Sequence, residues 1–305
     1  MIDINSLDFV ETFEISKATV GVVGFGYVGR AVGEFFRDHC RVLIYDRAMP
    51  EHGTLQKLVA DSEVVFICVP TPMNMTDGTC HTTIVELVIA DVLRVCGEVA
   101  RNPDSLVCVV KSTVTPGFTR NMRTKYPEMR VCFSPEFLTE KNSVNDFRSS
   151  NRIIVGGDSD DAQVVLKYFM DVQPQRVKND QLLLLHCDET VAEMTKLFTN
   201  GVLMTKVLFA NEVYQICQAL KISFDEVSAL TSLDSRVGTS HMSVPGHDGS
   251  LGAGGHCFPK DIHNLRSTSR SLGTGERLFT AVIDRNDELR TDKDWLAMQG
   301  RAVIG

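Results

Sequence analysis

The sequence predicts an α/β protein in which a doubly wound parallel sheet is followed by a long connecting helix and a small helical domain. Residues 18–185 alternate short β-branched runs with helical segments, the pattern of a parallel sheet covered by helices. A glycine-rich turn, residues 24–29, follows the first of these runs. Residues 188–220 carry apolar side chains at helical spacing and no proline, which predicts one long helix.

The strands and helices of the expected sheet can be placed from these runs. The expected strands are residues 18–23, 41–45, 63–69, 106–110, 131–133, 152–157 and 182–185. The expected helices between them are residues 28–36, 83–100 and 160–170. Ligands of such a sheet gather at the carboxyl ends of its strands, so residues that follow strands are the first candidates for a site.

The turn Gly24-Phe25-Gly26-Tyr27-Val28-Gly29 matches the pattern G-x-G-x-x-G between an expected strand and an expected helix. The next strand ends on Asp46, 20 positions after Gly26. This is the arrangement of a Rossmann unit, in which the glycines approach a pyrophosphate and the acidic residue binds ribose hydroxyls. That carboxylate would repel a 2′-phosphate, so we expect NAD. The expected cofactor-binding residues are Gly24, Gly26, Tyr27, Val28, Gly29, Asp46, Thr71 and Thr113.

Other polar residues also follow expected strands. Thr71 and Thr113 each come after one, and a third strand leads into a loop with Glu136 and Glu140. These positions suit a ligand, but threonines are also common in ordinary turns and acidic loop residues are commonly solvated.

The long helix expected at residues 188–220 begins at the N-cap Asp188, with Glu189 in its first turn. At 1.5 Å per residue it spans about 50 Å. One small domain does not cover such a length, so the helix should link two domains or form a subunit interface. Lys196 and Asn200 lie four residues apart and share one face, although such residues often simply face solvent. A second helix is expected at residues 224–230.

The segment Gly252-Ala253-Gly254-Gly255-His256-Cys257-Phe258-Pro259-Lys260-Asp261 has the composition of a presented nucleophile. Its glycines permit positive φ and close approach to a ligand, and they lead to a thiol beside a lysine and a carboxylate. Pro259 stiffens the turn, so Cys257 and Asp261 keep a fixed relation. The alternative is a surface turn with an inert cysteine, since the chain has nine cysteines.

Composition narrows the class of protein. The 305 residues suffice for two domains, and hydrophobic content of 43% with charged content of 23% is ordinary for a globular chain. A net charge of −8 argues against nucleic-acid or membrane-surface partners, and no apolar run reaches transmembrane length. The cysteines lack a CxxC pair, and the acidic residues 1–14 lack the basic region of a signal peptide. We therefore expect a cytoplasmic protein with reduced thiols and no metal site.

The ordered set of motifs resembles the UDP-glucose/GDP-mannose dehydrogenase family. Each motif alone is weak, but the set follows the family's order from about residue 18 to about residue 290, which makes it specific. The motifs are Gly24-x-Gly26-Tyr27-Val28-Gly29, Ser112-Thr113-Val114-x-Pro116-Gly117, Pro135-Glu136-Phe137-Leu138, Lys196-x-x-x-Asn200, Asn211-Glu212, Arg236-Val237-Gly238 and Gly254-Gly255-x-Cys257-Phe258-Pro259-Lys260-Asp261.

The resemblance implies oxidation of a nucleotide-sugar C6 alcohol to the uronate, with two NAD consumed. Cys257 would add to the C6 aldehyde as a thiohemiacetal and then carry a thioester that water hydrolyses. Lys196 and Asn200 would stabilise the oxyanion, while the carboxylates would handle protons and Thr113 would position the water. The implied catalytic residues are Cys257, Lys196, Asn200, Asp261, Glu140, Glu136 and Thr113. The implied substrate-binding residues are Phe137, Leu138, Glu140, Lys196, Asn200, Arg236 and Gly254.

The resemblance also implies a homodimer through the long helix, with Arg236 reaching the sugar across the subunit boundary. The expected domains are an NAD-binding domain at residues 1–187 and a central domain at 188–295. Family members usually continue with a third, nucleotide-binding domain, and residues 296–305 look like its opening strand.

Several alternatives for the activity remain. Within the family we expect UDP-glucose as the substrate, with GDP-mannose or UDP-N-acetylmannosamine as alternatives. A β-hydroxyacid dehydrogenase has a similar nucleotide-binding domain and a similar Lys/Asn helix, but it would not depend on Cys257. A truncated NAD-binding subunit without activity of its own would fit a missing third domain.

Overall fold

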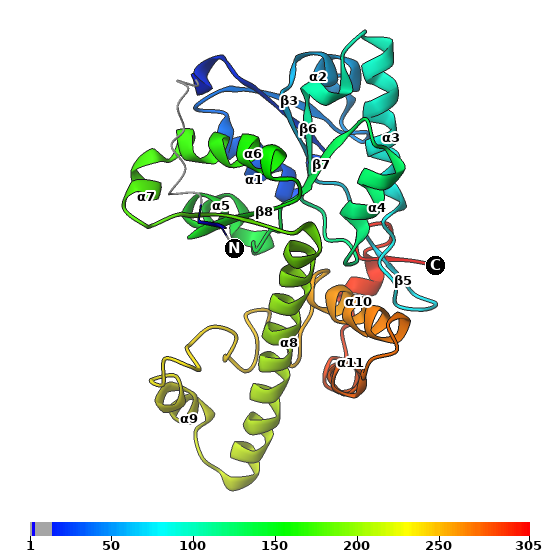
Figure 1. The fold of residues 1–305 in the computed structure, drawn as a ribbon. Helices are drawn as coiled ribbons and strands as arrows, with labels where there is room; N and C mark the ends of the chain where they lie inside the picture. The colour runs from blue at the N-terminus through cyan, green and yellow to red at the C-terminus, as the bar shows by residue number, and fades with distance from the viewer. Residues whose placement is uncertain (1, 4–13) are drawn as a thin grey trace. The chain divides into compact units, whose positions relative to one another are not determined.

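A computed structural model describes residues 2–3 and 14–305, and the chain divides into two compact units (Figure 1). Unit 1 comprises residues 1–71 and 82–196, and unit 2 comprises residues 72–81 and 197–305. The expectation concerning residues 1–14 falls largely outside the described residues. Short 3-10 turns lie at Ile15–Lys17, Pro50–His52, Pro103–Ser105, Glu140–Asn142 and Asp294–Ala297.

Unit 1 is built on an eight-stranded sheet in the order β1-β9-β8-β7-β6-β4-β2-β3. Its strands are β1 Ile2–Asp3, β2 Thr19–Val23, β3 Arg41–Tyr45, β4 Val64–Ile67, β6 Val107–Val110, β7 Arg130–Phe133, β8 Arg152–Gly156 and β9 Leu183–Cys187. The neighbours β3, β2, β4, β6 and β7 are all parallel. The α/β class predicted from the sequence is confirmed, with the addition that β8 and β9 run parallel to each other while β8 pairs antiparallel with β7.

The strand order creates one topological switch point. The chain winds from β2 outward to β3 on one side and to β4, β6 and β7 on the other. The carboxyl ends of β2 and β4 therefore border the crevice in which sheets of this kind bind ligands.

Successive side chains of the strands point to opposite faces of the sheet and belong to two separate hydrophobic cores. In β4, Val64 and Phe66 belong to one core, whereas Val65 and Ile67 belong to the other. The first core is covered by α1 Tyr27–Phe36, α5 Ser143–Ser149, α6 Ser159–Val172 and the short α7 Pro174–Lys178, and the second by α2 Leu55–Asp61, α3 Thr83–Glu98 and α4 Phe118–Lys125 (Figure 1). The helices α2, α4, α5 and α7 were not predicted, because elements of five to eight residues show little periodicity.

The long helix predicted from the sequence is present as α8, Glu189–Leu220. The Asp188 carboxylate accepts from the backbone N–H of Thr190 at 2.8 Å and of Val191 at 3.3 Å, which confirms it as the N-cap. Residues up to Lys196 belong to unit 1 and the remainder to unit 2.

Unit 2 packs the second part of α8 with three further helices. These are α9 Phe224–Thr231, α10 Phe258–Ser271 and α11 Arg277–Leu289. Residues 72–81 return to this unit, where β5 Met73–Asn74 pairs in parallel with β10 Val303–Ile304. In the described part of the chain, no helix combines the length and the apolarity needed to cross a bilayer.

His263 of α10 packs under the loop of residues 72–81. A Cβ built on Gly78 would lie 3.0 Å from Nδ1 of His263, and this nitrogen lies 3.1 Å from Nη2 of Arg266. A guanidinium can only donate, so Nδ1 accepts and the imidazole is neutral. Burial, followed by the charges of Arg266 and Arg270 and despite Asp287, lowers the pKa of His263 to about 4.

This low pKa predicts acid lability that depends on one side chain. Because the folded pKa of about 4 lies below the ordinary value of 6.5, the stability contributed by neutral His263 is complete above pH 6.5 and is lost as the pH falls through 4. From pH 7.5 to pH 4.5 this loss amounts to about 2–3 kcal/mol of unfolding free energy. Urea unfolding at both pH values should show it in the wild type and not in His263→Gln. The exposed His39→Gln variant should behave like the wild type, and an equal acid loss in His263→Gln would contradict the assignment.

Candidate active site

Three glycines of the turn after β2 meet three different constraints. Gly24 has a φ of +87°, and Gly29 packs so tightly that a Cβ there would lie 1.9 Å from the carbonyl oxygen of Gly24. Gly26 differs, since among the described residues no atom beyond its chain neighbours lies within 4 Å of a Cβ built on it. This arrangement suits a bound pyrophosphate, because Gly24 forms the tight turn, Gly29 allows close packing of α1, and Gly26 leaves the backbone open at the start of α1. The residues present therefore fit NAD.

Asp46, at the end of β3, also holds this turn. Its Oδ2 accepts from the backbone N–H of Phe25 at 2.7 Å, and its Oδ1 accepts from that of Ala48 at 2.8 Å. The sequence pattern predicts only a contact with ribose for this carboxylate. Each of its oxygens retains a second lone pair, so fixing the turn and binding hydroxyls are compatible.

Lys111, directly after β6, and Glu136, shortly after β7, form a buried ion pair that was not predicted from the sequence. The Lys111 side chain is 1% exposed, and its Nζ lies 2.8 Å from Oε2 of Glu136. The same Nζ lies 3.3 Å from Oγ of Ser134 and from the carbonyl oxygen of Pro135. The only sequence signal for this pair is a lysine directly after a buried apolar strand.

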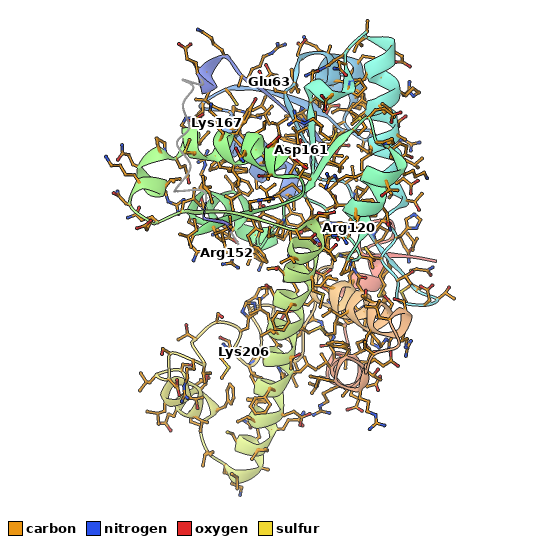
Figure 2. All side chains as sticks on the ribbon, in the orientation of Figure 1. Glu63, Arg120, Arg152, Asp161, Lys167 and Lys206 are labelled. Carbon is orange, nitrogen blue, oxygen red and sulfur yellow. The ribbon has the colours of Figure 1, made fainter. Side chains whose placement is uncertain are left out.

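Lys196 of α8 contacts the loop that carries Glu136. Its Nζ donates to the backbone carbonyl of Glu136 and lies 5.3 Å from the centre of the Phe137 ring. The Arg152 guanidinium, labelled in Figure 2, lies 4.6 Å from the same ring centre. Unit 1 therefore brings together three residues of the expected site, namely Glu136, Phe137 and Lys196.

The remaining expected residues of unit 1 occupy varied environments. Thr71 is buried and Thr113 is half-buried at their strand ends, while Leu138 packs against the first core. Glu140 opens a short 3-10 turn and is exposed.

Unit 2 presents Cys257 immediately before α10. The carbonyl oxygen of Cys257 accepts from the backbone N–H of Asp261 at 2.9 Å, which places the carboxylate in the first turn of the helix. Asp261 is 1% exposed, and its Oδ2 accepts from Nδ2 of Asn200 at 2.5 Å. Its Oδ1 accepts from Nζ of Lys260 at 2.6 Å. The expected residues Asn200, Cys257 and Asp261 thus meet within unit 2, together with Lys260.

Lys260 supplies the positive charge of this group. Burial lowers the pKa of its ammonium, but Asp261, Cys80 and Cys257 act in the opposite direction, and the pKa is raised on balance. The residue therefore stays cationic at any physiological pH. A cation near a cysteine favours the thiolate, the form that acts as a nucleophile. The second thiol, Cys80, comes from the loop of residues 72–81 and was not predicted.

The glycine segment before Cys257 is fixed by residues that lie far from it in the sequence. Gly252 N–H donates to Oδ1 of Asn211 at 3.1 Å, and Gly255 N–H donates to the Asp294 carboxylate at 3.0 Å. Asn286 pairs with both backbone groups of Ala253, accepting at 2.7 Å and donating at 3.0 Å. Asn286 and Asp294 carry no sequence signal, whereas Asn211 belongs to one of the motifs.

Arg236 lies on the surface of unit 2. Its side chain is 86% exposed and pairs with Asp234 at 2.6 Å. The loop after it is held by Lys206 of α8, whose Nζ donates to the carbonyl oxygen of Val237 at 2.8 Å and of Gly238 at 3.3 Å (Figure 2).

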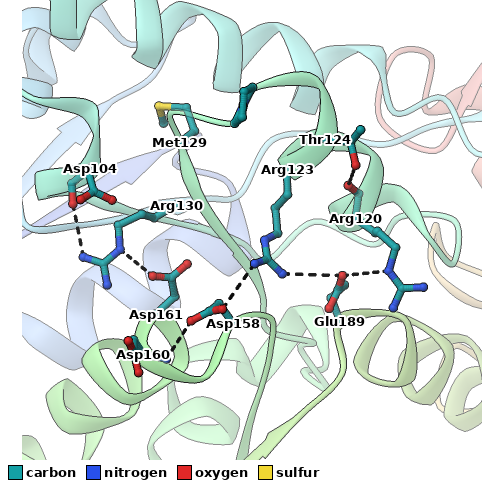
Figure 3. A pocket seen from close by; sticks show the side chains of 11 residues that line it. Asp104, Arg120, Arg123, Thr124, Met129, Arg130, Asp158, Asp160, Asp161 and Glu189 are labelled. Carbon is teal, nitrogen blue, oxygen red and sulfur yellow. Dashed lines mark hydrogen bonds and ion pairs between the residues drawn. The ribbon is translucent and has the colours of Figure 1, made fainter.

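Unit 1 also has a cavity of about 770 Å³, and none of the residues expected in the active site lines it (Figure 3). Arg120, Arg123 and Arg130 line it, and each is paired with a carboxylate of the same wall. Its charges are therefore compensated within the protein. Elsewhere too, within the described ranges, no group of three or more His, Cys, Asp or Glu side chains is arranged to hold a metal ion.

Comparison with protein families gives two matches from one family. The NAD binding domain of the UDP-glucose/GDP-mannose dehydrogenase family matches residues 47–171, and the central domain of that family matches residues 190–288.

Comparison with curated proteins finds similar chains. A UDP-glucose 6-dehydrogenase of Streptococcus pneumoniae is 28% identical, over 91% of this chain and 74% of that protein. The UDP-glucose 6-dehydrogenase AglM of Haloferax volcanii is 30% identical, over 75% of this chain and 53% of that protein. The chain therefore spans about three quarters of the first relative and about half of the second.

Solved structures show the same likeness. A UDP-glucose dehydrogenase from the hyperthermophilic archaeon Pyrobaculum islandicum has a TM-score of 0.77 and 28% identity, covering 92% of this chain and 70% of its own. A Mycobacterium tuberculosis 3-hydroxyisobutyrate dehydrogenase has a TM-score of 0.67 over 91% of this chain and 95% of its own, but its 17% identity shows only a shared fold.

The open space at Gly26 gives a test of the cofactor site. Gly26→Ala should leave the thermal midpoint close to that of the wild type, because its Cβ meets no described atom, while weakening NAD binding about tenfold or more. Gly29→Ala should instead unfold the domain more readily. Gly97→Ala, at an uncrowded site in α3, is the matched control and should keep the wild-type affinity. Calorimetric titration with NAD measures the affinity, and unchanged affinity in Gly26→Ala would place the pyrophosphate elsewhere.

Proposed function

We propose that this chain, which belongs to the UDP-glucose/GDP-mannose dehydrogenase family, oxidises UDP-glucose at C6 to UDP-glucuronate with NAD as the hydride acceptor. The family resemblance drawn from the motifs is confirmed by the two matching family domains, and NAD as cofactor is confirmed by the first of them. The choice of UDP-glucose is supported by similar proteins that are named UDP-glucose 6-dehydrogenases. GDP-mannose and UDP-N-acetylmannosamine remain the alternative substrates.

The observation that carries this proposal is the group at the start of α10. A thiol of the Cys257 type is needed when an aldehyde must be oxidised further, because addition of sulfur creates a carbon that can lose a second hydride. NAD, when bound, accepts the hydride in each of the two oxidation steps. Between these steps the Cys257 sulfur bonds to the aldehyde carbon, which gives a thiohemiacetal. Loss of the second hydride and a proton converts the thiohemiacetal to a thioester, and water hydrolyses the thioester, which releases the thiol and the carboxylate.

The buried polar groups suit the other needs of this reaction. Asn200 and Lys196 share one face of α8 and are proposed to stabilise the oxyanion that forms at C6. Asp261 is bonded to Asn200 and Lys260, so it can hold the amide in one orientation as well as relay a proton. Glu140 or Glu136, with Thr113, is proposed to handle the hydrolytic water. The backbone and side chains of residues 137–140 are proposed to hold the sugar-phosphate region, with Gly254 near the sugar.

We also propose that the chain forms a homodimer through α8. Several large apolar side chains of its unit 2 portion are exposed and recur at intervals of four and seven residues, which places them on one face. They are Phe198, Val202, Phe209, Ile216 and Leu220. A second copy of the chain would cover this face, and Arg236 would then contact the sugar bound by the partner subunit.

The stoichiometry of the reaction tests the activity. Purified protein should form two NADH for each UDP-glucose consumed, and Cys257→Ala should lose acid formation by at least about a hundredfold. Cys187→Ala, another half-buried cysteine, is the matched control and should retain two NADH. Absorbance at the NADH band together with chromatography of the sugar nucleotide gives both quantities.

Other outcomes identify the alternatives. One NADH per substrate with full activity of Cys257→Ala would favour a β-hydroxyacid dehydrogenase. NAD binding without turnover of UDP-glucose, GDP-mannose or UDP-N-acetylmannosamine would favour a subunit that needs a further polypeptide.

A single charge placed on the exposed face tests the dimer. Phe209→Asp should convert a dimer to a monomer in sedimentation velocity, because a carboxylate would be buried opposite its own copy. Gln218→Asp adds the same charge at an exposed position half a turn round the helix and should remain dimeric. Dimers that persist in Phe209→Asp would exclude this face as the interface.

A further inference from the structure

Lys111 is a buried cation that the proposed reaction does not use. It follows β6, its side chain is 1% exposed, and the Glu136 carboxylate lies 2.8 Å away. Its Nζ also lies 5.3 Å from the centre of the Phe147 ring. A buried lysine is retained only when its charge is compensated, so the Lys111–Glu136 pair is a fixed part of this strand-end region.

Two of the three oxygens of Glu136 accept hydrogen bonds, and the third, Oε2, forms an ion pair without hydrogen-bond geometry. Oε2 faces the Lys111 ammonium at 2.8 Å, and Oε1 accepts from the backbone N–H of Phe137 at 3.0 Å. The backbone carbonyl oxygen accepts from Nζ of Lys196. The carboxylate therefore fixes the peptide group between Glu136 and Phe137, and the carbonyl oxygen of that same peptide group accepts from Lys196.

The Lys196 ammonium is held by this same short segment. It is buried, and besides the Glu136 carbonyl it has the Phe137 ring centre at 5.3 Å. Both of these contacts depend on the peptide between Glu136 and Phe137. Because the Glu136 carboxylate fixes that peptide and Lys111 fixes the carboxylate, a change at Lys111 reaches Lys196 through a continuous series of contacts.

We propose that Lys111 is a positioning residue, which holds the Glu136 carboxylate in place through their ion pair and thereby orients the Lys196 ammonium toward the developing oxyanion. In this arrangement Glu136 serves as an anchor, and the exposed Glu140 is the carboxylate that activates the hydrolytic water. The inference rests on the proposed function for the role of Lys196, but the contacts themselves do not depend on the identity of the substrate.

The charged and titratable groups around this pair come from three other elements. Lys196 approaches from α8 and Arg152 from β8, where both lie over the Phe137 ring. Cys68 follows β4, and burial raises its pKa to about 12, with Lys111 and Glu136 acting on it in opposite directions. Cys68 therefore stays a neutral thiol, and Lys111 is the cation that compensates the Glu136 carboxylate.

The first test is kinetic and uses the whole chain. Lys111→Met should lower kcat about 10- to 100-fold, because misplacing a catalytic group by about 1 Å costs this much, while the KM for NAD stays the same. Lys125→Met removes the lysine of an exposed ion pair in the same unit and should change neither quantity.

A double variant guards against simple misfolding. Lys111→Met leaves a buried carboxylate unpaired, whereas Lys111→Met combined with Glu136→Gln removes both charges and should recover thermal stability. If Lys111 acts through Glu136, the double variant should have a kcat no lower than that of the worse single variant. Additive losses in the double variant, or an unchanged kcat in Lys111→Met, would overturn the proposal.

A second measurement needs no turnover, so it separates this inference from the proposed function. Amine acylation followed by peptide mass spectrometry should show Lys196 reacting several-fold faster in Lys111→Met than in the wild type. The reason is that the contacts of Lys196 with the Glu136 carbonyl and the Phe137 ring would be weakened. Lys206, on the same helix and outside this group, should react equally in both proteins. Unchanged labelling of Lys196 would refute the inference even in an active enzyme, and faster labelling would support it even if UDP-glucose were not the substrate.

Discussion

A charge that leaves water must find a partner inside the protein, and this requirement organises the functional region of both units. In unit 1 the partners are Lys111 and Glu136, and in unit 2 they are Lys260 and Asp261. Removing one member of such a pair costs about 3–5 kcal/mol, because the other charge stays buried. These side chains therefore have fixed positions before any ligand binds, and fixed positions are what electrostatic catalysis requires.

The helix α8 contacts one member of each ion pair. Lys196 and Asn200 lie one turn apart on it, yet their partners are different: Lys196 bonds to the Glu136 carbonyl and Asn200 to the Asp261 carboxylate. Glu193, three residues before Lys196, is fully buried and accepts from the backbone N–H groups of Gly117 and Thr119 at 2.5 and 2.8 Å, at the start of α4. One face of a single helix thus holds a helix cap and both proposed oxyanion donors, so the spacing along that helix is strongly constrained.

The sequence was sufficient for features that depend on neighbouring residues. The strand Arg41–Tyr45, the cap at Asp188 and the glycine turn are set by local backbone sterics and hydrogen bonds, and they were predicted at or near their observed positions. Contacts across long separations were not predicted. Nothing in the residues around Lys111 points to a carboxylate 25 positions later, and nothing around Ala253 points to Asn286. The chain order of the motifs gave the family, but only the fold shows which residues support them.

The glycines of the cysteine segment illustrate why a motif does not by itself assign roles. A Cβ on Gly254 would lie 2.1 Å from Nη2 of Arg290, a 3% exposed residue, so packing alone accounts for this glycine. Gly252 is likewise explained by its φ of +71° and by the nearby Asn286. Gly255 has positive φ, but its Cβ position meets no atom of the described residues other than its chain neighbours. A ligand therefore has room to approach the backbone closely at Gly255, two residues before the thiol. At Gly254 the position of a Cβ is already occupied by the Arg290 side chain.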